Sequence, residues 1–130
     1  MRNAILFFAV LVLLSFVASG QVSAQEAPKV INVLSVDTGG DTAAFLEFTK
    51  RAKAIGDQHG GTGNQRVWLS SFAGPNTGTV VVAVEYPSAV SMAQSQAKVN
   101  SSPEWQKFVA DFQASGMRVI SNSVSVEITP

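Results

Sequence analysis

The chain has 130 residues, 46% of them hydrophobic, and its nine basic residues balance its nine acidic ones. Nucleic acid and anionic membrane surfaces are bound through an excess of basic residues, so the composition argues against both as partners. The absence of cysteine removes disulfides and thiolate nucleophiles, and a single histidine argues against a histidine-based metal site, so we expect no metal or cofactor.

Residues 1–24 have the features of a secretory signal peptide. Arg2 supplies a positive start, residues 5–17 are an almost unbroken apolar run, and the small side chain of Ala24 ends a cleavable sequence. An uncleaved anchor is the alternative, but the run is short for a membrane span of about 20 residues. We therefore expect cleavage after Ala24, export to the periplasm or the exterior, and one mature domain of residues 25–130 outside the membrane.

The first two elements after this segment are a strand and a helix. Residues 30–36 are rich in β-branched side chains and predict a strand. Asp41 or Thr42 can cap a helix that runs to about residue 58, before the glycine-rich residues 59–64. Its apolar side chains recur at helical spacing and predict a buried stripe. They are Ala44, Phe45, Phe48, Ala52 and Ile55.

A hairpin and a helix come next. Residues 65–72 and 79–86 predict two strands joined by the turn-rich residues 73–78. A helix from residue 88 to about residue 99 follows. Its expected apolar side consists of Ala89, Met92, Ala93 and Val99.

The helical region is expected to break at the sequence NSSPEWQKF, residues 100–108. Ser102 can cap a new helix, Pro103 suits its first position, and Glu104 lies where the helix dipole favours negative charge. A stripe of Trp105, Phe108, Val109 and Phe112 follows, and Gly116 ends the helix. Residues 117–129 then predict an alternating last strand that suits a sheet edge.

This order predicts an α+β, ferredoxin-like βαββαβ fold. Two right-handed crossovers place the first and third strands in the centre of a four-stranded antiparallel sheet, with both helical regions on one face. Apolar side chains left in water on the other face would each forgo about 1.5–3 kcal/mol. We therefore expect a homodimer that packs sheet against sheet around a shared interior.

The chain resembles the dimeric α/β-barrel superfamily, which includes antibiotic-biosynthesis monooxygenase-type domains. The resemblance follows the element order of residues 25–130 and is most specific at EYPSAVSMAQSQAKVNSSPEWQKF, residues 85–108. It implies a dimeric barrel but no single reaction, because the superfamily contains cofactor-free oxygenases, haem-degrading enzymes, isomerases, decarboxylating enzymes and members of no known reaction. Haem-degrading members share an Asn, a Trp and a later His; only Asn32 matches, because Trp68 lies on the second strand and no histidine follows His59.

Six residues are candidates for a ligand pocket: Asn32, His59, Arg66, Trp68, Glu85 and Tyr86. His59 is the one histidine and could act in acid–base chemistry, although a polar residue at a helix end is the favoured interpretation. Arg66 and Trp68 share a strand face and could bind an aromatic or acidic ligand, and the favoured alternative places Trp68 at the dimer seam.

The remaining candidates are open to two interpretations each. Glu85, with Tyr86 beside it, ends the third strand, where a carboxylate in an apolar setting can act as a base, although a solvated strand end is favoured. Asn32 is either a structural hydrogen-bonding residue or a polar group of a pocket.

Two hypotheses for function follow. In the first, the exported dimer binds a small apolar or aromatic molecule in a cavity between helices and sheet, and transforms it as a cofactor-independent monooxygenase does. In the alternative, a non-catalytic exported dimer with a filled interior binds a ligand or another protein.

Overall fold

The computed structural model describes residues 26–71 and 74–128, so the expected signal peptide lies outside the described residues. No helix within these two ranges is long and apolar enough to cross a membrane. The elements in chain order are β1 (Val30–Asp37), α1 (Thr42–Gln58), β2 (Asn64–Leu69), the short 3-10 helix η1 (Gly74–Asn76), β3 (Val80–Tyr86), α2 (Ala89–Asn100), α3 (Pro103–Ala114) and β4 (Arg118–Val126).

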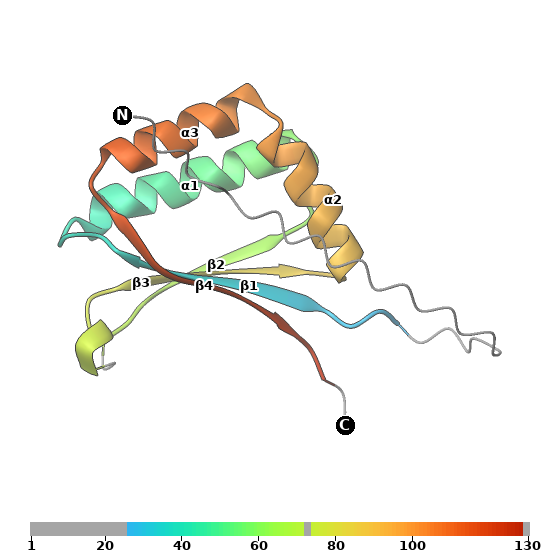
Figure 1. The fold of residues 1–130 in the computed structure, drawn as a ribbon, viewed down its shortest axis with the longest axis horizontal. Coiled ribbons are helices and arrows are strands. Elements are labelled where there is room, and N and C mark those ends of the chain that lie inside the picture. The colour runs from blue at the N-terminus through green and yellow to red at the C-terminus, as the bar shows by residue number, and fades with distance from the viewer. Residues whose placement is uncertain (1–25, 72–73, 129–130) are drawn as a thin grey trace, which may run out of the picture.

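The four strands form one antiparallel sheet in the order β2-β3-β1-β4. The helices α1, α2 and α3 lie on one side of this sheet, and no α-helix or strand of the described chain covers its other side (Figure 1). The predicted α+β, ferredoxin-like fold with two central strands is therefore confirmed, and so is the break between α2 and α3.

The helix boundaries follow local capping chemistry. The Asp41 carboxylate accepts a hydrogen bond from the Ala44 N–H at 2.9 Å and begins α1. The Ser102 hydroxyl oxygen accepts from the Trp105 N–H at 3.2 Å, and Pro103 follows at the first position of α3. Gly116, at φ 78°, turns the chain from α3 into β4.

The two faces of the sheet can be assigned from the strand register, because directly paired residues point to the same side. Val36, Val80 and Val82 pack with Phe45 of α1 and define the helix-covered face. The same face includes Val30, Asn32 and Leu34 of β1, Val84 and Tyr86 of β3, Val67 and Leu69 of β2, and Val124 and Val126 of β4. The open face carries Ile31, Val33, Ser35, Arg66, Trp68, Val81, Ala83, Glu85, Ser121, Ser123 and Ser125.

Aromatic side chains join the helices to the core. The Phe112 ring of α3 lies edge-on to Phe45 and Phe48 of α1, with centroid distances of 6.3 and 5.7 Å. The predicted stripe of α3 is therefore confirmed in direction, but no residue of α3 is fully buried, because this helix packs mainly on α1.

The predicted apolar side of α2 is confirmed for Met92 and Val99, which are half-buried, and is wrong for its two alanines. Ala89 and Ala93 are exposed, and the buried residue of α2 is Ser95. The Ser95 hydroxyl oxygen accepts a hydrogen bond from the Thr62 N–H at 3.1 Å, and the Ser91 and Thr62 hydroxyls lie 2.7 Å apart. Because α2 covers the loop before β2, its buried side is partly polar.

Gly63 in this loop provides a test of the packing between the loop and β3. A β-carbon there would collide with Val84 Cγ1 and lie 2.9 Å from Tyr86 Cε1. We expect Gly63→Ala to lower the free energy of unfolding by about 1–3 kcal/mol, because side chains of a packed region must move. Gly56 of α1 is a matched control with open space around it, so Gly56→Ala should raise stability by about 0.5–1 kcal/mol. Urea unfolding measures both, and similar effects would contradict the close approach.

Candidate functional site

The structure separates the six candidate residues into three places. Asn32 and Tyr86 lie on the helix-covered face of the two central strands. Arg66, Trp68 and Glu85 lie on the open face. His59 follows α1 as its C-terminal cap. Sequence alternation groups residues within one strand, but it does not show which face of each strand meets the helices.

Asn32 has an unusual environment on the helix-covered face. Its side-chain oxygen is buried and has no hydrogen-bond partner within the described residues. In the register, Asn32 lies between Val84 of β3 and Val124 of β4. Val124 and Val126 are 52% and 54% exposed, because the second half of β4 extends beyond the helices (Figure 1). A half-buried amide therefore borders an exposed apolar surface.

Tyr86 lies diagonally across from Asn32, since Tyr86 pairs with Val30. Its side chain is only 8% exposed and forms a hydrogen bond with the side chain of Gln96 on α2. Burial raises the pKa of the Tyr86 phenol, and the hydrogen bond from Gln96 partly opposes this. Tyr86 is therefore a neutral polar group near Asn32 at physiological pH.

The open face has a polar end that sequence reasoning did not find. Lys29 Nζ lies 3.6 Å from Glu85 Oε1, and a shallow cavity of about 220 Å³ adjoins this ion pair. The cavity is lined by Lys29, Ile31, Glu85, Ser125, Val126 and Glu127. Lys29 and Glu127 are neighbours because the Glu127 N–H donates to the Lys29 carbonyl at 2.9 Å. Only the β1–β4 register could have predicted this meeting of the two ends of the domain.

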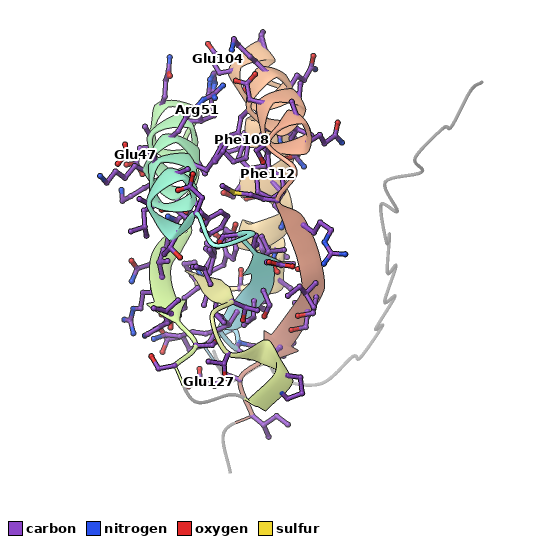
Figure 2. All side chains as sticks on the ribbon, turned by 90° about the vertical axis from the view of Figure 1, so that its left-hand side faces the viewer. Glu47, Arg51, Glu104, Phe108, Phe112 and Glu127 are labelled. Carbon is purple, nitrogen blue, oxygen red and sulfur yellow. The ribbon has the colours of Figure 1, made fainter. Side chains whose placement is uncertain are left out.

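A second charged group holds the two long helices together. Arg51 of α1 forms a 2.7 Å ion pair with Asp111 of α3 and lies 5.6 Å above the Phe108 ring. Figure 2 shows Arg51 and Phe108 in the space between these helices, far from Glu127 at the other side of the sheet. Hydrogen bonds from Lys107 and Arg51 lower the pKa of the Asp111 carboxyl. These contacts fix the helix pair but bring no reactive group to Asn32.

His59 also belongs to the helix pair. Its Nε2 atom lies 3.1 Å from Glu104 Oε2, which connects the end of α1 to the first turn of α3. A cavity of about 200 Å³ beside α1 is lined by Ala44, Glu47, Phe48 and Arg51 and does not contain His59. Across residues 26–71 and 74–128, no three His, Cys, Asp or Glu side chains gather in a way that could hold a metal ion.

Solved structures share this architecture. An uncharacterized NIPSNAP-like domain protein from Burkholderia xenovorans matches with a TM-score of 0.60 at 16% identity, over 82% of this chain and 88% of that one. SnoaB, a cofactor-independent oxygenase from Streptomyces nogalater, matches with a TM-score of 0.55 at 12% identity, over 80% and 95% of the two chains. These matches show that the chain shares its fold with these structures.

A NIPSNAP family protein of unknown function from Agrobacterium tumefaciens gives a similar result. It matches with a TM-score of 0.57 at 14% identity, over 78% of this chain and 87% of that one. No model of a known protein family matches the chain, and no curated protein matches it either. Identities this low show a common fold and carry no reaction to this chain.

Tyr86 makes the site testable through alkaline pH. Because its pKa is raised in the folded state, its contribution to stability is present below the unfolded pKa of 10 and is lost as pH rises through the folded value. We expect Tyr86→Phe to remove this loss and flatten the stability profile above pH 10. At pH 7 the variant should be less stable by about 1 kcal/mol, because Gln96 loses its partner. Urea unfolding between pH 7 and 11 measures both effects, and an unchanged alkaline slope would contradict the burial of the phenol.

Proposed function

We propose that the protein is an exported homodimer that binds a small apolar or aromatic molecule beside Asn32. The observation that carries this proposal is the buried Asn32 Oδ1 atom without a hydrogen-bond partner in the described chain. Buried polar atoms nearly always have a partner, so this oxygen calls for a donor. A ligand hydroxyl or amide would supply one, since the Asn32 amide can turn about its last torsion. The ligand's apolar part would then lie on Val124 and Val126.

The homodimer part of the proposal is supported by the open face. Ile31 and Trp68 are 36% and 49% exposed, and the half-buried Val33, Val81 and Ala83 lie between them. A contiguous apolar stripe with polar flanks is typical of a protein interface. A second copy of the chain would cover this stripe in a two-fold contact.

Binding without catalysis is the function that the geometry supports best. The strand residues on the helix-covered face that lie near Asn32 and are polar are Tyr86, Asn122 and Gln65, and no Asp, Glu, His or Lys of the four strands shares that face. An efficient general base must lie within hydrogen-bonding reach of its substrate, and Glu85 points to the opposite side of the sheet.

A cofactor-independent oxygenase reaction is the second candidate. It is favoured by the fold shared with SnoaB, and by the same apolar surface that a ligand would use. In that case the ligand would be consumed together with oxygen, so oxygen-electrode measurements with small phenols separate catalysis from binding.

The hydrogen bond to Asn32 can be tested with 1-naphthol and naphthalene, which differ by one hydroxyl donor. We expect the wild type to bind 1-naphthol about tenfold more tightly than naphthalene, the usual value of one net hydrogen bond. Asn32→Leu should abolish this difference. The same change should raise the stability of the free protein by about 1 kcal/mol, because it removes a buried acceptor without a partner.

Asn64 is the control, because it is an exposed asparagine of the edge strand β2 that pairs with Glu85 and so lies on the open face, away from Asn32. Asn64→Leu should keep the preference for 1-naphthol and change stability by less than about 0.5 kcal/mol. Titration calorimetry and urea unfolding measure these quantities. Equal binding of both probes by the wild type would contradict a ligand hydrogen bond at Asn32.

Native mass spectrometry of the full chain expressed with its first 24 residues tests the assembly and export. We expect the mass of a dimer built from chains that begin at Gln25, because cleavage is expected after Ala24. Sedimentation at micromolar concentration provides the independent check. A folded single chain at that concentration would contradict the homodimer, and an intact N-terminus would contradict cleavage.

A further inference from the structure

One basic and one acidic residue of the open face have no ion-pair partner within the described chain. The charged residues of this face and its ends are Lys29, Asp37, Arg66, Glu85, Arg118 and Glu127. Lys29 pairs with Glu85 at 3.6 Å, and Arg118 pairs with Asp37 at 2.9 Å. Of these six residues, Arg66 and Glu127 have no ion pair within the described chain, and both are exposed.

These two residues lie at opposite edges of the sheet. Arg66 lies on the edge strand β2, whereas Glu127 directly follows the other edge strand, β4. Glu127 lines the cavity of about 220 Å³ that also contains the Lys29–Glu85 pair. The cavity therefore holds two carboxylates and one ammonium group, and this excess negative charge favours a further cation.

We propose that two copies pack open face to open face, so that Arg66 of each enters this cavity and pairs with Glu127 of the partner subunit. This inference rests on the proposed homodimer and adds the contact that sets its orientation. In a two-fold contact the pair forms twice, and every charge of the open face then has a partner. The planar guanidinium can bind a carboxylate through two parallel hydrogen bonds, which fixes direction as well as distance.

A second copy fits this cavity better than a free cation does. Covering the apolar stripe with any partner would also desolvate Arg66, which lies beside Trp68 on the same strand face. A buried guanidinium without an anion is strongly unfavourable, so the covering surface must present a carboxylate to it. The chain presents an unpaired carboxylate of its own at the opposite edge, which makes the face complementary to itself.

The strand register gives the orientation of this dimer. Arg66 shares a row with Val33, and Glu127 shares one with Lys29, so the two charges are offset by about 13 Å along the strands. Three strand spacings separate them by about 14 Å across the sheet. A two-fold axis parallel to the sheets must bring Arg66 of one copy over Glu127 of the other. Because the two offsets are nearly equal, this axis runs at about 45° to the strands, and the strands of the two sheets cross at about 90°. That angle belongs to the orthogonal class of sheet packing.

Charge reversal with rescue tests the pair. We expect Arg66→Glu and Glu127→Arg each to weaken the dimer at least about tenfold, because each places like charges together. The double variant restores the pair with its charges exchanged, and we expect its dissociation constant to return to within about threefold of the wild type. Sedimentation equilibrium at low and high salt provides the constants, and circular dichroism shows that each chain is folded.

Lys53→Glu is the matched control, since Lys53 is an exposed cation on α1, on the other side of the sheet, and should leave dimerisation unchanged. A wild-type dimer that the single reversals do not weaken, or that the double variant does not restore, overturns the Arg66–Glu127 pair and leaves the homodimer standing. A wild type that stays a single chain overturns the proposed homodimer itself. If a charge reversal prevents folding, Arg66→Gln and Glu127→Gln replace it. Both should raise the dissociation constant of the dimer and make that constant less dependent on salt.

Discussion

The covering of the sheet on only one face is the constraint on which the rest of the structure depends. Both crossovers of a βαββαβ chain are right-handed, so the helices must arrive on the same side. The three helices, with the aromatic side chains of α1 and α3, then cover the centre of one face, while the other is left to water or to a partner. The composition of the open face favours a partner over water. The central strands contribute Ile31, Val33, Val81 and Ala83, whereas edge strand β4 contributes Ser121, Ser123 and Ser125. An apolar centre with a polar edge is how interfaces are built.

The fold could be predicted because its signals are local. Asp41, Ser102 and Pro103 act on backbone groups within three residues, so their effect does not depend on what the helix later packs against. The central position of β3 could be predicted from its own residues. The sequence Val-Val-Val-Ala-Val is apolar on both faces of the strand, and a strand of this kind is stable only where both faces are covered. The polar part of the buried side of α2 could not be predicted, because the partner of Ser95 is Thr62, in a loop that precedes β2.

The candidate site could be predicted only in its residue types. In β4 the serines and valines alternate, so the polar side is visible in the sequence. In β1 both alternations are mostly apolar, and nothing in the sequence shows whether Asn32 or Ile31 faces the helices. Only the register against Val84 and Val124 places Asn32 on the helix-covered face. Lys29 and Glu127 were missed because neither residue type nor spacing marks a contact between the two ends of a domain.

Neighbouring residues of β1 connect the two faces of the sheet. Asn32 borders the proposed ligand surface, and Ile31 borders the cavity on the open face. Because successive side chains of a strand point to opposite sides, a partner that packs on Ile31 need not contribute a side chain to the Asn32 site. Such a partner would affect the Asn32 site by fixing the position of the β1 backbone. The outer half of β4, which carries Val124 and Val126, is exposed on both faces and is held mainly by its pairing with β1. Packing against Ser123 and Ser125 from the open side would restrict this strand, and the apolar surface beside Asn32 would then be held in one shape. In this arrangement dimerisation organises the ligand surface, and the two copies each keep a complete site.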